Sequence, residues 1–194
     1  MKRLLACLAV LFLLLASAGA EEAPFDFKQF RWGDGKDAII AVEGAPAQRI
    51  TDSQYQAEIL CYHTTVAGLK AQLSYMLGDT EGLFIVVYSL LEKQDDATGY
   101  IGDYDLLREV LTGKYGTPVY DDMAWNCGEV LQEVYQDDLD TAFRLGYVTF
   151  ETVYETDTTM IFLTMEGEMF GATTELVYQS KIVQPSLRDF SNEI

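Results

Sequence analysis

The chain has 194 residues, with 31 acidic against 13 basic side chains and a formal net charge of −18. Because this charge would repel the phosphates of a nucleic acid, the composition argues against a nucleic-acid partner. A chain of this length favours one globular domain, large enough to bury about two thirds of its unfolded surface without support from a metal or a disulfide.

Residues 1–20 have the pattern of a cleaved signal peptide. Lys2 and Arg3 form a basic start, residues 4–16 are an unbroken apolar run, and Ala18-Gly19-Ala20 supplies the small residues that signal peptidase requires. As a helix, the apolar run would reach only about 20 Å, which is short of the roughly 30 Å hydrocarbon core of a membrane. Cleavage after Ala20 would leave 11 basic and 31 acidic side chains, so we expect an exported protein of net charge −20, secreted or in the cell envelope, with no stable membrane span.

The segment that follows predicts a short helix and then three strands. The helix is expected over residues 34–43, where Asp34 can cap the first turn. It should end at Gly44 and Pro46, because glycine permits a left-handed cap and proline cannot continue a helix. Apolar runs at 55–64, 69–77 and 83–91, separated by glycine-containing turns, predict an antiparallel meander. The last run is apolar on both faces and should lie centrally in a sheet.

The same order of elements returns in the second half of the chain. Asp103 is the expected cap of a helix over 104–115, which should end at Gly116 and Pro118. A connection over 119–145 leads to three further strand-like runs at 147–156, 159–165 and 172–180.

These elements predict an α+β fold with two layers, built as a tandem pseudo-repeat of one helix followed by a three-stranded antiparallel meander. Each helix has one apolar stripe, so packing that stripe on the sheet leaves the other sheet face to solvent or to a partner. The expected single domain spans residues 21–181, with pseudo-repeats over about 28–92 and 100–181. Residues 182–194 should form a loose C-terminal tail.

Four motifs occur along the chain, Phe30-Arg31-Trp32-Gly33, Val66-Ala67-Gly68-Leu69, Tyr115-Gly116-Thr117-Pro118 and Tyr178-Gln179-Ser180-Lys181. These motifs resemble those of small exported proteins of anaerobic gut bacteria, many of which are lipoproteins. The resemblance covers roughly residues 28–181 and implies export and a repeated helix-plus-meander fold, but no reaction. At the level of the fold alone, the Gly-x-Pro helix ends also resemble the SmpA/OmlA outer-membrane lipoproteins and the β-lactamase inhibitor protein, whose roles are protein binding. This chain lacks a usable lipobox, because the apolar run follows Cys7 instead of preceding it.

The sequence contains no nucleophile elbow, zincin helix, P-loop or dinucleotide-binding glycine motif, and it predicts no cofactor and no metal site. His63 is the only histidine, and we interpret it as a strand-end or surface residue. Cys61 and Cys127 remain after removal of the signal peptide, which is an even number for an exported protein. A disulfide between them is one alternative, and two free thiols are the other.

Acidic pairs and tyrosines are the remaining candidates for a site. Pairs of carboxylates, as at Asp121-Asp122 and Asp137-Asp138, are so abundant that solvated acidic loops explain them best. Tyrosines recur on the predicted strands, where they provide rigid contact area for binding or stabilise the sheet through cross-strand pairs. The candidate binding residues are Tyr75, Tyr88, Tyr147 and Tyr154, and structural roles are expected for Trp32, Gly33, Gly44, Pro46, Gly116 and Pro118.

These features favour an exported, non-enzymatic binding or protein-interaction module. Its acidic surface would suit a partner protein with a basic patch. Two alternatives stay open, namely a hydrolase that uses paired carboxylates and a sensor of a small ligand or cation.

Overall fold

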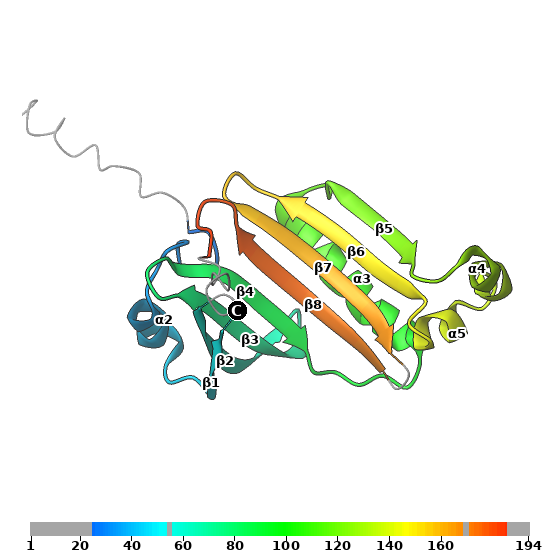
Figure 1. The fold of residues 1–194 in the computed structure, drawn as a ribbon, viewed down its shortest axis with the longest axis horizontal. Coiled ribbons are helices and arrows are strands. Elements are labelled where there is room, and N and C mark those ends of the chain that lie inside the picture. Colours follow the sequence, from blue (N-terminus) through cyan, green and yellow to red (C-terminus); the bar gives the residue numbers. More distant parts are fainter. Residues whose placement is uncertain (1–24, 54–55, 169–170, 186–194) are drawn as a thin grey trace, which may run out of the picture.

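The computed structural model describes residues 25–53, 56–168 and 171–185. The predicted signal peptide, and residues 186–194 of the predicted tail, lie outside the described residues. The described part contains a single antiparallel sheet of eight strands, in the order β1-β2-β3-β4-β8-β7-β6-β5 (Figure 1).

Each half of this sheet takes four consecutive strands, and each group of strands comes after a helix. Strands β4 and β8 pair antiparallel, so the two halves form one continuous sheet. The first half consists of α2 (Lys36–Glu43), β1 (Gln48–Asp52), β2 (Ala57–Val66), β3 (Leu69–Gly78) and β4 (Gly82–Leu90). The second half consists of α3 (Ala97–Tyr115), β5 (Tyr120–Trp125), α4 (Glu129–Tyr135), α5 (Leu139–Arg144), β6 (Val148–Glu155), β7 (Thr159–Glu168) and β8 (Gly171–Ser180).

The predicted fold, a tandem repeat of one helix and a three-stranded meander, is wrong. The six predicted strands are present, but β1 and β5 pair at the two edges, and all eight strands join in one sheet. Both edge strands are mostly exposed and carry polar residues, so they lack the apolar alternation that marks the other six. The connection predicted over 119–145 contains β5, α4 and α5. The central place predicted for the run 83–91 is confirmed, since β4 pairs with both β3 and β8.

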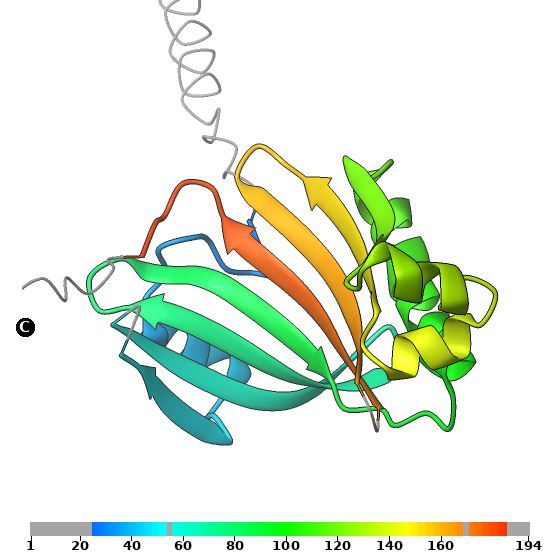
Figure 2. The same cartoon turned by 45° about the vertical axis from the view of Figure 1, so that its right-hand side comes forward.

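Helices α3 and α5 pack on one face of the sheet. Helix α2 lies on the same face, over the first four strands (Figures 1 and 2). Glu43 of α2 accepts a hydrogen bond from Tyr75 of β3, and Tyr104 of α3 bonds to Thr152 of β6. Because alternate residues of a strand point to opposite faces, every second residue of these strands points away from the helices. We term the side under the helices the covered face and the other side the open face.

The N-terminal segment 25–32 also lies on the covered face, over the central strands. Phe30 is 1% exposed, and its ring centre lies 5.5 Å from that of Tyr75 in β3. Phe27 packs against Tyr75 and, at a ring distance of 4.9 Å, against Tyr178 of β8. Trp32 donates its indole N–H to Thr159 Oγ1 of β7 at 2.9 Å. This segment therefore connects both halves of the sheet.

Both main helices end at the predicted glycines, because Gly44 and Gly116 have φ values of 84° and 83°. The predicted starts are wrong. Asp34 accepts the backbone N–H of Arg31 instead of capping α2, and α3 begins at Ala97 after its cap Asp96. No helix in the described residues is long and apolar enough to cross a membrane. The other residues with predicted structural roles lie beside these helix ends, with Gly33 at φ 94° before α2, and Pro46 and Pro118 just after α2 and α3.

Candidate functional site

Three of the four candidate tyrosines are buried on the covered face. Tyr75, Tyr88 and Tyr154 are 0%, 7% and 1% exposed. Tyr147 is half-buried just before β6, and its ring centre lies 5.6 Å from that of Tyr135 in α4. The structure therefore does not bring the four tyrosines together on one surface.

Tyr75 joins the sheet to α2 through a polar contact. Its hydroxyl donates a hydrogen bond to Glu43 Oε1 at 2.5 Å, and the same oxygen accepts from Lys28 Nζ at 2.9 Å. Burial, with the Glu43 carboxylate as the next cause, raises the pKa of Tyr75 far above its usual value. Burial also raises the pKa of Glu43, but the hydrogen bonds from Tyr75 and Lys28 outweigh it and hold this pKa below its usual value. At neutral pH the contact joins a neutral phenol to a carboxylate, which is a structural arrangement.

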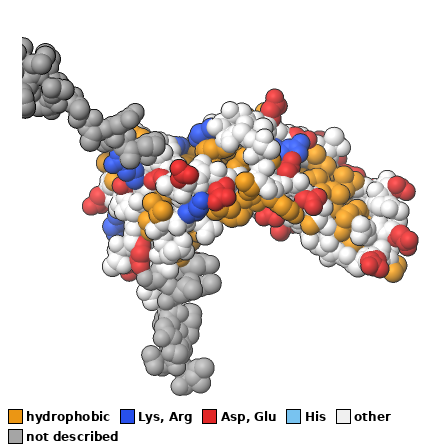
Figure 3. All heavy atoms as spheres, turned by 90° about the horizontal axis from the view of Figure 1, so that it is seen from above, with side chains coloured by type: hydrophobic (Ala, Val, Ile, Leu, Met, Phe, Trp, Pro, Cys, Tyr) orange, Lys and Arg blue, Asp and Glu red, His pale blue; other side chains and the backbone are white. Residues whose placement is uncertain are grey.

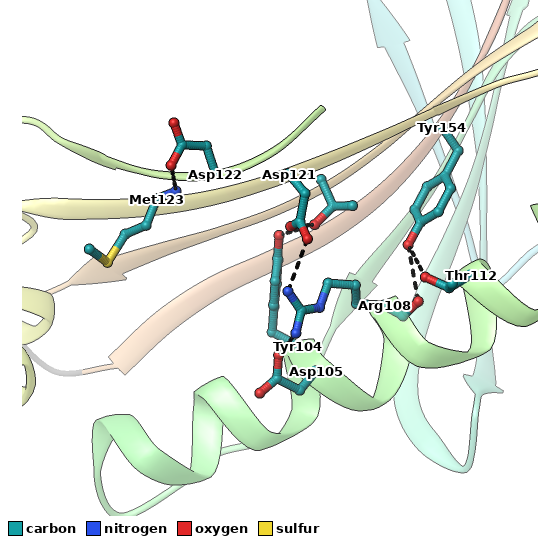
Figure 4. Close-up of polar contacts among 9 residues, drawn as sticks. Tyr104, Asp105, Arg108, Thr112, Asp121, Asp122, Met123 and Tyr154 are labelled. Carbon is teal, nitrogen blue, oxygen red and sulfur yellow. Dashed lines mark hydrogen bonds and ion pairs between the residues drawn. The ribbon is translucent and has the colours of Figure 1, made fainter. Parts of the chain in front are cut away.

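A polar network fastens α3 to strands β5 and β6 (Figure 4). Thr152 has one hydroxyl proton and donates it to Asp121 Oδ1 at 2.8 Å, so Tyr104 must donate to Thr152 Oγ1 at 2.6 Å. Arg108 bonds to the other oxygen of Asp121 at 3.1 Å and to Asp105 at 3.0 Å. Burial raises the pKa of Tyr104 to about 12, so its hydroxyl remains a donor at neutral pH. Each polar group has a partner within the fold, which indicates a structural network.

Replacing Thr152 by valine is expected to lower the free energy of unfolding by about 1–3 kcal/mol, because it leaves the buried Tyr104 hydroxyl without an acceptor. Urea denaturation measures the change. Thr164→Val on the open face of β7 is the matched control, and it should change stability by less than about 0.5 kcal/mol, because Thr164 is half-buried and valine suits a strand. Equal losses in the two variants would contradict a structural role for the network.

Three further aspartates, Asp96, Asp138 and Asp140, have structural partners at helix starts. Asp96 caps α3 by accepting from the Gly99 N–H, and Asp138 caps α5 by accepting from the Thr141 N–H. Asp140 accepts from the Ala97 N–H at the start of α3. These acids therefore stabilise helix starts in the described structure.

The two cysteines within the described residues, Cys61 and Cys127, are free thiols in this structure. Cys61 lies buried in β2, the second strand of the sheet, whereas Cys127 follows β5 at the opposite edge. Strands lie about 4.8 Å apart, and a disulfide requires Cα atoms within about 7 Å. His63 is exposed on β2, in agreement with its interpretation as a surface residue.

The open face carries an apolar row that runs straight across four strands. Val87 of β4 pairs with Val177 of β8, which pairs with Phe162 of β7, which pairs with Val153 of β6. A second row beside it contains Ile59, Met76, Ile85 and Met160, interrupted by Gln179. No described helix covers these side chains, and Figure 3 shows hydrophobic side chains along the inner side of the arched molecule. Sequence reasoning missed this row, although the signal was present as apolar residues at both alternations of the strand runs.

Carboxylates flank the apolar row on its other side. Glu175 of β8, Glu151 of β6 and Asp122 of β5 lie in one cross-strand row with Ser89 and Thr164. Ser89 donates to Glu175 at 3.0 Å, but none of the three carboxylates forms an ion pair with a described residue. The open face is therefore an apolar band with an acidic border.

Helix α4 lies at the edge of the sheet that carries β5 (Figure 2), and it also combines apolar side chains with carboxylates. It has no buried residue, and Val130 and Val134 are 74% and 63% exposed. Glu129 and Glu133 lie on the same helix. Apolar side chains next to carboxylates thus occur both on the open face and at its margin. Those of the open-face row are half-buried, apart from the buried Val153, and those of α4 are exposed.

Comparison of the chain with known protein families, with curated proteins and with solved structures finds no match. The candidate site consequently stands on the geometry of the open face alone.

Proposed function

We propose that this protein is a binding module that holds a protein or peptide segment on the open face, and that it works outside the cytoplasm after export. The pattern of residues 1–20 supports export. The apolar row of Val87, Val177, Phe162 and Val153 beside the carboxylates of Glu175 and Glu151 supports the binding role, and it is the observation that carries the proposal.

The chemistry of this face favours a partner with apolar side chains bordered by Lys or Arg. Apolar contact would supply most of the affinity, and the carboxylates would set orientation and specificity. A second copy of the chain fits poorly, because each copy would carry a net charge of −20 after cleavage at Ala20 and would place its carboxylates against those of the other. The apolar row is four strands wide, or roughly 15 Å, which matches one extended strand or one helix of a partner.

Two synthetic peptides test the proposal. One alternates leucine with lysine and arginine, and the other has glutamate in place of every basic residue. We expect the basic peptide to bind at least about tenfold more tightly, with an affinity that falls as salt is added, because Asp122 is exposed and Glu151 and Glu175 are only half-buried. Equal binding of the two peptides would show that the carboxylates of the acidic border do not contribute to binding.

The variant Phe162→Ser should weaken binding of the basic peptide about tenfold or more, because it removes the largest side chain of the apolar row. Val110→Ser is the matched control, since Val110 is 50% exposed on α3 in the other layer. Thermal melting establishes that both variants remain folded. The additional variant Glu151→Gln changes charge with little change in shape and should also weaken binding. Unaltered affinity in both open-face variants would refute the proposed site.

A further inference from the structure

Basic residues gather at one end of this acidic molecule. The described residues include ten Lys and Arg residues, and three of them, Lys28, Arg31 and Lys114, line one pocket. Lys181 lies beside it, because its Nζ donates to the carbonyl of Thr156, another lining residue. The pocket is formed by the N-terminal segment, the end of α3 and the turn between β6 and β7. Figure 1 shows this turn at the upper end of the sheet.

The walls of this pocket combine those cations with apolar and aromatic surface. It has a volume of about 910 Å³, which is within the range of small-molecule sites. Phe25 and Ile182 are 53% and 61% exposed at its mouth, and Tyr115 and Trp32 contribute further ring surface. The guanidinium carbon of Arg31 lies 5.5 Å from the ring centre of Phe25. A ligand in this pocket would therefore contact flat apolar surface and positive charge at the same time.

Lys114 is the cation best placed to meet a ligand. Its Nζ lies 4.8 Å from the ring centre of Tyr115, and it forms no ion pair with a described residue. By contrast, Lys28 pairs with Glu43 at 2.9 Å. Two carboxylates also line the pocket, those of Asp26 and Asp157. Asp26 is engaged in the wall itself, because one oxygen accepts from the Thr158 hydroxyl and the other from the backbone N–H of Trp32.

From this geometry we infer that the pocket binds a small organic anion with a flat apolar body. The ligand's carboxylate would meet Lys114, and its ring would lie against Phe25 and Tyr115. This inference is independent of the open face, which has the opposite charge preference and lies on the other side of the sheet.

Isothermal titration calorimetry with naphthalene-2-carboxylate tests the inference on the full chain. A ligand of this size should bind with a Kd of about 1 mM or tighter. Naphthalene-2-methanol has the same ring without the charge, and it should bind at least about fivefold more weakly. Absence of binding by the carboxylate at about ten times this concentration, or equal binding of the alcohol, would overturn the assignment.

The variant Lys114→Met keeps an apolar side chain and removes the charge. It should weaken carboxylate binding about fivefold and leave alcohol binding unchanged. Lys70→Met is the matched control, because Lys70 is an exposed lysine on β3 outside this pocket and should have no effect. Carboxylate affinity that is the same in K114M and in the parent protein would refute the role of Lys114. Shifts of the Trp32 indole N–H resonance on titration place the ligand in this pocket, whereas shifts confined to Trp125 of β5 would contradict it.

The chain's own residues Glu21 and Glu22 come shortly before Phe25 and lie outside the described residues. The double variant Glu21→Gln/Glu22→Gln distinguishes them from an external ligand. If only this double variant bound naphthalene-2-carboxylate, the acidic segment would be the natural occupant, and the inference of an external ligand would be overturned.

Discussion

Replacing Gly167 by alanine is expected to lower the free energy of unfolding by about 3 kcal/mol. Gly167 is buried in β7, directly under α5. A Cβ atom at this position would lie well under 3.0 Å from the carbonyl group of Phe143. Because that group belongs to the backbone, relief requires α5 to move away from the sheet, although Phe143 and Ala142 are both fully buried there.

The matched control is Gly102→Ala in the interior of α3. A Cβ at Gly102 meets no atom within 4 Å, so this change should raise stability by about 0.5–1 kcal/mol through the better helix propensity of alanine. Urea denaturation of both variants measures the difference. Similar effects of the two substitutions would show that α5 does not pack on β7 as described.

Stability is also expected to fall as the pH rises from about 10 to about 12. Burial is the largest cause that raises the pKa of Tyr88 and of Tyr104 from 10 to about 12, and it raises the pKa of Tyr75 and Tyr178 further. Between these pH values the folded protein retains phenol protons that the unfolded chain loses, so the free energy of unfolding decreases with pH. With allowance for solvent screening, Tyr88 and Tyr104 each contribute about 1–2 kcal/mol, fully present below pH 10.

Urea denaturation at a series of pH values measures this decrease. Tyr88→Phe removes one of the titrating groups and should make the decrease less steep, whereas Tyr120→Phe on the exposed edge strand β5 should not change it. A free energy of unfolding that stays level across this pH range would be incompatible with the buried tyrosines described here.

Local patterns predicted the inner strands well, because each has a side-chain alternation or an apolar run that needs no distant partner. The run 69–77 alternates apolar and polar residues, and it appears as β3 at Leu69–Gly78. The two edge strands escaped prediction because an edge strand is held by hydrogen bonds to one neighbour, as when β5 pairs with β6, and needs little apolar burial. Helix ends were predictable at Gly44 and Gly116, where the backbone requires positive φ.

The candidate site was less predictable than the fold elements. Tyrosines were predicted as contact residues because tyrosine is common in binding surfaces. In the structure, Tyr75, Tyr88 and Tyr154 are buried on the covered face, and the hydroxyls of Tyr75 and Tyr154 form hydrogen bonds within the protein. The open-face residue Phe162 belongs to a strand that is apolar at both alternations. Such a pattern shows that both faces are apolar, but not which one receives a helix.

The sequence by itself determined the strongly acidic charge, the export pattern of residues 1–20, the six inner strands and the glycine ends of both main helices, because each depends on residues close together in the chain. Tertiary structure alone decided that β4 pairs with β8, since that pairing joins segments about 90 residues apart. It also decided which alternation of each strand faces α2, α3 and α5. The sequence alone could not predict the apolar row or the basic pocket, because each is formed by segments that are distant in the chain.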